Sequence, residues 1–234
     1  MNYLAHVYLS GDGVDAQLGG LLGDFIKGPL PLVWLDPNMA EPLIEARSKA
    51  VQGIGSHEKP HPLLLNRSGR PWSRELLAGI YLHRLIDAYI DQHPLFKSCI
   101  ERLGPEHRRV AGIALDVFFD HLLARLWRRV HLQSLADFSG AFYAHCAARS
   151  DELPIRAATL MARAQEHKLF ESYAQLDVIA AVLIRIDQRL SRRTSLTRIM
   201  PVLEAEEGFL LQQFELLLPE LQAFSSQQRR ALAL

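Results

Sequence analysis

Two aspartates and a histidine stand inside a strongly apolar stretch of this sequence. Asp116, Asp120 and His121 lie in the run ALDVFFDHLL at positions 114–123. A helix that is apolar on all sides normally lies in a protein core. An ionised carboxylate in a core must be paired, hydrogen-bonded or bound to a metal, or it takes up a proton. The sequence therefore predicts partners for both aspartates, either a metal ion or an arginine such as Arg84 or Arg125.

A second set of candidate ligands has the spacing of one helix face. His83, Asp87 and Asp91 follow one another at intervals of four residues, and each interval advances a helix only ~40° past a full turn. If this stripe faces Asp116 and Asp120, imidazole and carboxylate groups converge in a helical core, which is how helix bundles build metal sites. Such ligands without cysteine suit harder ions, namely Mn²⁺, Mg²⁺ or Fe²⁺. The plainer alternative is a set of local hydrogen bonds.

Motifs of several other enzyme classes are absent. The glycines at 19 and 20 fit neither the dinucleotide-binding nor the Walker pattern, and there is no His-Glu-x-x-His zinc motif. No Gly-x-Ser-x-Gly nucleophile elbow occurs either. The histidine and aspartate stripes thus remain the candidate chemistry.

The elements that must position these residues are predicted to be helices. Apolar periodicity and boundary residues, including Ser73 as an N-cap, indicate helices over 14–26, 74–91, 95–103, 106–130, 135–149, 155–166, 170–190 and 200–217. Residues 3–9 fit either a helical turn or a short extended piece. Gly19, Gly20 and Gly23 lower helix propensity, so we expect another backbone to come close there. With no hairpin signal and no internal repeat, the sequence predicts an all-α single domain of seven to nine helices.

The segment from about residue 30 to residue 73 has a different texture. It carries six prolines and several glycines, and only 41–52 suggests a short helix. A structureless stretch of this length is unusual inside a compact domain. We interpret it as an insertion laid over the fold, with a lid as one role for it.

Composition indicates an ordinary globular protein. Lysine plus arginine equals aspartate plus glutamate at 26 each, so the net charge says nothing about a polyanionic partner. We expect no nucleic-acid binding. Cys99 and Cys146 have no metal or redox spacing, which favours a reducing compartment. The N-terminus lacks a signal-peptide pattern, and the apolar run at 178–184 is too short to cross a bilayer. We therefore expect a cytoplasmic protein with no membrane association.

Four ordered blocks resemble the acyl carrier protein phosphodiesterase family. They are NYLAH at 2–6, GGLLGDFIKG at 19–28, GIYLHRLID at 79–87 with Asp91 and His93-Pro94 beyond it, and LDVFFDHLL at 115–123. The sequence LSRR at 190–193 resembles a later block. The chain departs from the family pattern at Gly20, where the family commonly has asparagine, and in the length of the proline-rich segment.

The resemblance implies a helical fold like that of the HD-domain metal-dependent phosphohydrolases and a manganese-assisted hydrolysis. The reaction would cleave the phosphodiester of holo acyl carrier protein, releasing 4′-phosphopantetheine and the apo carrier. The family's metal positions would fall on His6, Asp24, His83, Asp87 and either Asp120 or Asp116. We expect Asp120 to contact the metal, while Asp87 or Asp116 orients ligands or holds a second ion.

Other residues are candidates for roles around the phosphate. His121 or His93 is the predicted proton donor, and Arg84, Lys27 and Arg192 are predicted to bind the phosphate. For Arg84 the alternative is an ion pair with Asp87 along the same helix.

An acyl carrier protein is small and strongly acidic, so the resemblance also implies a basic docking face. The candidates lie on or beside the long central helix: Arg108, Arg109, Arg125, Arg128 and Arg129. Two rival functions remain at this point. One is an HD-like nucleotide phosphohydrolase that uses the same metal residues, and the other is a non-catalytic helical adaptor that binds a carrier protein.

Overall fold

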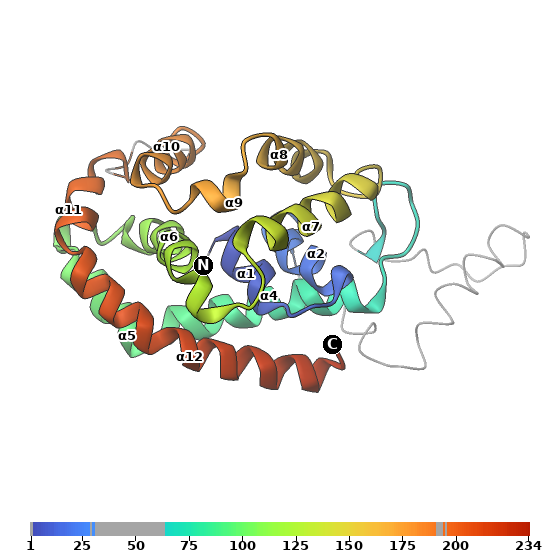
Figure 1. Ribbon diagram of the computed structural model, residues 1–234, viewed down its shortest axis with the longest axis horizontal. Coiled ribbons are helices and arrows are strands. Elements are labelled where there is room, and N and C mark those ends of the chain that lie inside the picture. Colours follow the sequence, from blue (N-terminus) through green and yellow to red (C-terminus); the bar gives the residue numbers. More distant parts are fainter. Residues whose placement is uncertain (1, 29, 31–63, 191–193, 195) are drawn as a thin grey trace, which may run out of the picture.

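The computed structural model describes residues 2–28, 30, 64–190, 194 and 196–234 (Figure 1). Within these residues the regular structure is helical, apart from one isolated antiparallel bridge between Leu65 and Pro71, and the all-α prediction is confirmed. The α-helices are α1 (Tyr3–Leu9), α2 (Val14–Leu22), α4 (Arg74–Gln92), α5 (Pro94–Arg102), α6 (Ala111–Val130), α7 (Leu135–Ala148), α8 (Ile155–Glu166), α9 (Leu169–Ser172), α10 (Leu176–Asp187), α11 (Met200–Ala205) and α12 (Glu207–Leu232), with short 3₁₀ turns at Pro105–His107 and Leu196–Arg198.

The described segments thus hold eleven α-helices, more than the seven to nine expected. Two expected helices are each divided, 170–190 into α9 and α10 and 200–217 into α11 and α12, and residues 3–9 form a helix of their own. Helix α12 runs on past Pro219 because its buried face continues through Leu221. Ser73 caps α4 as predicted, since its Oγ accepts from the Leu76 N–H at 3.1 Å. The helix expected at 41–52 lies outside the described residues.

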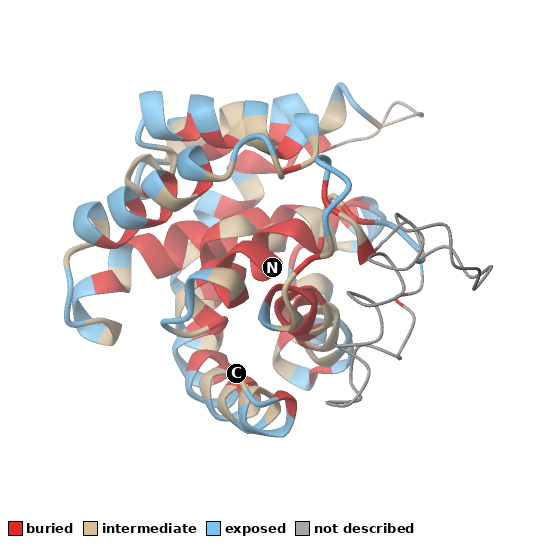
Figure 2. Cartoon of the chain, turned by 90° about the vertical axis from the view of Figure 1, so that its right-hand side faces the viewer, coloured by how far each residue is buried: buried red, intermediate tan, exposed pale blue. Residues whose placement is uncertain are grey.

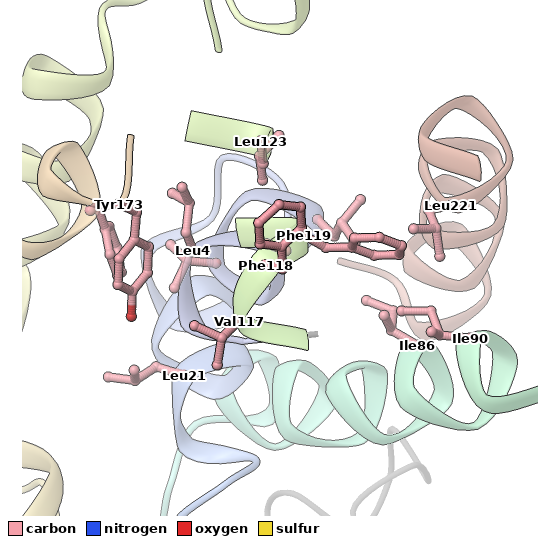
Figure 3. Close-up of a cluster of buried hydrophobic side chains, with 14 of the residues drawn as sticks. Leu4, Leu21, Ile86, Ile90, Val117, Phe118, Phe119, Leu123, Tyr173 and Leu221 are labelled. Carbon is pink, nitrogen blue, oxygen red and sulfur yellow. The ribbon is translucent and has the colours of Figure 1, made fainter. Parts of the chain in front are cut away.

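Helix α6 runs through the middle of the core. Its buried face contains the aromatic and aliphatic residues of the run 114–123, and the buried side chains form one cluster that extends from Leu4 to Leu232. Figure 3 shows Val117, Phe118 and Phe119 of α6 between Tyr173 on one side and Ile86, Ile90 and Leu221 on the other.

The other helices surround α6. Figure 1 draws α8, α9 and α10 along one edge of the molecule and α5 and α12 along the opposite edge. In Figure 2 the central helices are largely buried, while the outer helices carry exposed faces. Within the described part of the chain, no helix combines the length and the hydropathy that crossing a bilayer requires.

Glycines bring α2 and α4 into backbone contact. A Cβ placed on Gly19 would lie 2.2 Å from the carbonyl oxygen of Leu76, and one on Gly79 would lie 2.4 Å from that of Ala16. Such contacts leave no room for any side chain. The close approach expected at Gly19 is therefore confirmed, and it holds the end of α2 against His83 of α4.

Candidate metal centre and adjoining cleft

Three side chains from α1 and α4 form a compact group with metal-ligand character. The ligand atoms of His6, His83 and Asp87 all lie within 4.8 Å of one another. His6 Nε2 is 3.0 Å from Asp87 Oδ1, and His83 Nε2 is 3.2 Å from Asp87 Oδ2. The two imidazole rings stack with their centroids 3.6 Å apart. Both histidines are buried, whereas the Asp87 side chain is 41% exposed, so the group opens to solvent on its carboxylate side.

The hydrogen bonding of His83 fits a cation at this place. Its Nδ1 lies 2.7 Å from the carbonyl oxygen of Gly20, and a carbonyl can only accept, so Nδ1 carries the proton. In the neutral ring, Nε2 then presents a lone pair to Asp87 and, at 3.8 Å, to Asp24. A lone pair facing two carboxylates is unfavourable unless a proton or a metal ion stands between them. Metal-binding histidines are commonly held in this way, with the second nitrogen donating to a carbonyl.

The electrostatics of the group keep its ligands in metal-binding form. Burial, together with the charge of the neighbouring His83, lowers the pKa of His6 to about 3, so its imidazole is neutral at pH 7. Burial opposes the charge on Asp87, but the adjacent imidazoles of His6 and His83 outweigh it and hold the pKa of that carboxyl well below its usual range. A neutral imidazole and an ionised carboxylate are the forms that coordinate metal ions.

Asp120 positions His6 from a distance. Its carboxylate is fully buried, and its two oxygens accept from the backbone N–H groups of Leu4 at 2.8 Å and Ala5 at 3.1 Å. These are orphan donors in the first turn of α1, so Asp120 caps that helix from 115 residues away in sequence. Burial raises the pKa of Asp120 to about 7, although the two N–H groups act in the opposite direction. The partner of this aspartate in the structure is thus a helix terminus, not Arg84 or Arg125.

Two glycines make room for the histidines. A Cβ on Gly23 would lie 2.2 Å from the His83 ring, and one on Gly20 would lie 2.3 Å from Ser10 Oγ and 2.9 Å from the His6 carbonyl oxygen. Ser10 Oγ itself donates to that carbonyl at 2.7 Å. An asparagine therefore has no room at position 20 in this chain, because Ser10 occupies the space beside His6.

The turn after α2 presents Asp24, and Arg84 supports it. Arg84 Nη2 donates to the carbonyl oxygen of Ile26 at 2.8 Å, which ties the turn to α4. The Asp24 side chain is 40% exposed. Arg84 therefore has a clear structural partner in this turn, while the predicted phosphate ligand Lys27 is exposed just beyond it.

A cleft of about 1050 Å³ adjoins the group on the Asp24 side. Segments from the N-terminus, the α2 turn, the 65–72 segment, α6, α8 and α10 line it, contributing Asn2, Tyr3, Asp24, Phe25, Ile26, Lys27, Leu65, Asn66, Arg67, Trp72, Ile113, Asp116, Val117, Pro154, Ile155, Arg156, Thr159, Leu160, Arg163, Ile186 and Arg189. The charged residues of this lining are two aspartates and Lys27 together with four arginines.

Asp116 and Tyr3 stand on the cleft wall near the carboxylates. Burial raises the pKa of Asp116, and the charges of Asp87 and Asp91 act in the same direction. Burial likewise raises the pKa of Tyr3 to about 12, with Asp24 adding to the shift and Arg189 opposing it. Tyr3 thus interacts electrostatically with both the Asp24 carboxylate and the Arg189 guanidinium.

The structure brings some predicted residues together and leaves others apart. Asp91 is exposed and does not extend the stripe of His83 and Asp87 into the metal-ligand group. His121 is 1% exposed and its Nδ1 lies 2.8 Å from the Tyr173 carbonyl oxygen. His93 caps α5 through the Leu95 N–H and its Nε2 lies 3.2 Å from a carboxylate oxygen of Glu220 on α12. Neither histidine lines the cleft.

Two arginines of the predicted docking face, Arg125 and Arg129, form ion pairs with glutamates of α12. Arg125 pairs with Glu207, and Arg129 pairs with Glu215 at 2.6 Å, both across the contact of α6 with α12. Arg192 lies outside the described residues. The arginines of the cleft were missed, although Arg156 and Arg163 have the seven-residue spacing that places them on one face of a helix.

Comparison with known proteins places the site in a known family. A family described as "Acyl carrier protein phosphodiesterase" matches residues 1–47 and 65–221. Proteins named acyl carrier protein phosphodiesterase are similar to this chain. One from Serratia proteamaculans is 29% identical over 84% of this chain and 82% of its own length, and one from Salmonella paratyphi A is 28% identical over 95% and 96%. One from Yersinia enterocolitica is 30% identical over 78% and 76%. No solved structure matches the chain.

Proposed function

This chain belongs to the acyl carrier protein phosphodiesterase family, and from that premise we propose that it is a metal-dependent hydrolase. Its substrate would be holo acyl carrier protein, and its products 4′-phosphopantetheine and the apo carrier. The observation that carries the proposal is the group of His6, His83 and Asp87, which lies inside the matched region and opens beside a cleft. We place the reaction beside Asp24, which lies between the group of His6, His83 and Asp87 and the cleft.

The donor set fits a divalent ion of the harder kind. Two imidazole nitrogens and a carboxylate, with Asp24 close by, suit Mn²⁺ first and Mg²⁺ or Fe²⁺ as alternatives. Such an ion, when bound, would lower the pKa of a water ligand and polarise a phosphoryl oxygen. In this proposal His6, His83 and Asp87 hold the ion and Asp24 completes its ligands on the side of the cleft.

The other residues of the chain position these ligands and the substrate. Asp120 fixes α1 and therefore His6, the Gly20 carbonyl fixes the His83 tautomer, and Arg84 fixes the turn that carries Asp24. Lys27 stands at the cleft with Asp116 on its wall, so a phosphodiester there would have a cation for its oxygens. We assign no chemical role to His93 or His121. Neither lines the cleft, and each has another partner: a Glu220 carboxylate oxygen for His93 and the Tyr173 carbonyl oxygen for His121.

Mass analysis of the carrier tests this function. The full chain, freed of metal by chelation and dialysis, is incubated with holo acyl carrier protein with and without added Mn²⁺. We expect the carrier to lose the mass of 4′-phosphopantetheine only when the metal is present. An unchanged carrier mass, under conditions where a nucleotide is hydrolysed, would favour a nucleotide phosphohydrolase. A protein that retains no manganese, magnesium or iron and hydrolyses neither substrate would instead be an adaptor.

A further inference from the structure

Helix α8 presents two arginines to the cleft. Arg156, Thr159, Leu160 and Arg163 all line it, and their spacing of three, four and seven residues is that of a single helix face. A neighbouring side of α8 is buried through Ala157, Met161 and Ala164. Packing of that buried side therefore fixes the direction in which the two arginines point.

These arginines belong to a group of cations that have no carboxylate partners within the described part of the chain. Arg156, Arg163 and Arg189 are exposed, and among the residues that the structure describes none of them has a carboxylate within 4.0 Å. Arg125 and Arg129, in contrast, each pair with a glutamate of α12. Like charges that gather without partners repel one another, and they attract an anionic ligand or protein.

A second cavity continues from the same cations. It has a volume of about 560 Å³, shares Tyr3, Arg163 and Arg189 with the cleft, and adds Arg185 from α10. In Figure 1, α8 and α10 both lie along the edge of the molecule away from α12, and both helices line this cavity. The arginines thus stand on a rim that joins the two hollows, not on an isolated convex surface.

We propose that Arg156, Arg163, Arg185 and Arg189, which we call the α8–α10 arginine face, form the docking surface for an acidic acyl carrier protein. The inference rests on the proposed function and moves the docking face away from α6. Ile155, 66% exposed in the first turn of α8 and lining the cleft, supplies an apolar contact beside the charges. A carrier seated on this face has the cleft beside it, so its serine-linked arm needs only to enter the cleft to reach Asp24.

Charge reversal in the full chain tests the docking surface. For the R156E/R163E double variant with Mn²⁺ and holo acyl carrier protein, we expect KM to rise by at least about tenfold while kcat stays within about twofold, because rim charges act mainly on association. The KM of the wild-type protein should also rise with salt, and that of the variant should depend on salt much less. The matched control is R108E/R128E, which changes the net charge equally at two exposed arginines elsewhere and should leave KM within about twofold.

Binding of the apo carrier separates this inference from the proposed function. Fluorescence anisotropy with labelled apo carrier needs neither metal nor chemistry, and melting curves confirm that both double variants are folded. If the wild-type protein cleaves holo carrier but R156E/R163E and R108E/R128E behave alike, the docking inference fails and the function stands. A fall in kcat at unchanged KM would place the arginines on the reacting phosphate and also overturn docking. If the wild-type protein binds apo carrier through these arginines yet cleaves nothing, docking stands and the proposed function fails.

Discussion

From the sequence alone, Asp87 and Asp120 would both be placed in one site, but the two carboxylates have different partners in this fold. Asp87 is partly exposed and faces two imidazoles, whereas Asp120 is fully buried and faces two backbone N–H groups. Their surroundings shift their pKa values in opposite directions, downward for Asp87 and upward for Asp120. The difference teaches that an aspartate close to a candidate metal-ligand group can hold the helix that carries one of its histidines, instead of joining the group itself.

The largest effect should come from removing the partly exposed carboxylate. We expect Asp87→Asn to lower turnover of holo carrier and metal retention by more than about 100-fold, since changes to residues that only support metal ligands already cost 10- to 100-fold. Metal content of the folded variant, measured by plasma mass spectrometry, checks this. Asp120→Asn is the isosteric control, because an amide oxygen can still accept one of the two N–H groups. Metal loss in the Asp120 variant but not in the Asp87 variant would reverse the two assignments.

The buried carboxylate should matter most for stability. Asp120→Ala leaves the N–H groups of Leu4 and Ala5 buried without their acceptor, so we expect the free energy of unfolding to fall by about 3 kcal/mol. Chemical denaturation monitored by circular dichroism gives the value. Asp116→Ala, on the cleft wall of the same helix, is the comparison and should cost less. Equal losses would mean that capping of α1 has no special weight.

The pH dependence of the unfolding free energy should also reflect the burial of Asp120. Asp120 has a raised pKa of about 7 in the folded protein, against an ordinary value of 3.8, so between these values the folded state binds more protons than the unfolded state. The unfolding free energy of the wild type, relative to Asp120→Asn, should therefore fall as pH rises from about 4 to 7, by at most about 1.4 kcal/mol per pH unit. A relative stability that does not fall over this range would show that the carboxylate is already ionised in the folded protein throughout it.

We expect the smallest effects from substitutions at two glycines. These variants compare the close packing beside His83 with the open space beside Gly112. Gly23→Ala forces a methyl group against the His83 ring, so we expect a loss of about 1–3 kcal/mol from overpacking together with weaker metal retention. Gly112→Ala, in α6 with open space around its Cβ, should stabilise the protein by about 0.5–1 kcal/mol through helix propensity. Thermal unfolding of both variants tests the contrast, and destabilisation by both would mean that the space at Gly112 is not open.

Much of the helical framework followed from the sequence alone. Helices such as α4 and α8 have an amphipathic pattern, and α4 also has a local cap in Ser73. Both features are properties of neighbouring residues. The pairing of His83 with Asp87 could be predicted for the same reason, because the helix repeat places residues four apart on one face. The glycines of α2 also predicted a close contact with another backbone, because glycine lowers helix propensity and is favoured in a helix only where a side chain would not fit.

Tertiary structure alone decided which distant groups meet. Helix α1 had no readable pattern because it is buried on nearly all sides and its terminal acceptor, Asp120, lies on α6. The contact between α6 and the start of α1 also decided the partner of Asp120. From its burial alone, that partner could have been a metal ion or an arginine. The arginines of α6 that pair with α12 and the arginines of α8, which have no carboxylate partner among the described residues, look alike in sequence, and only the approach of α12 to α6 separates them. Ion pairing depends on a few ångströms between helices, which no local pattern specifies.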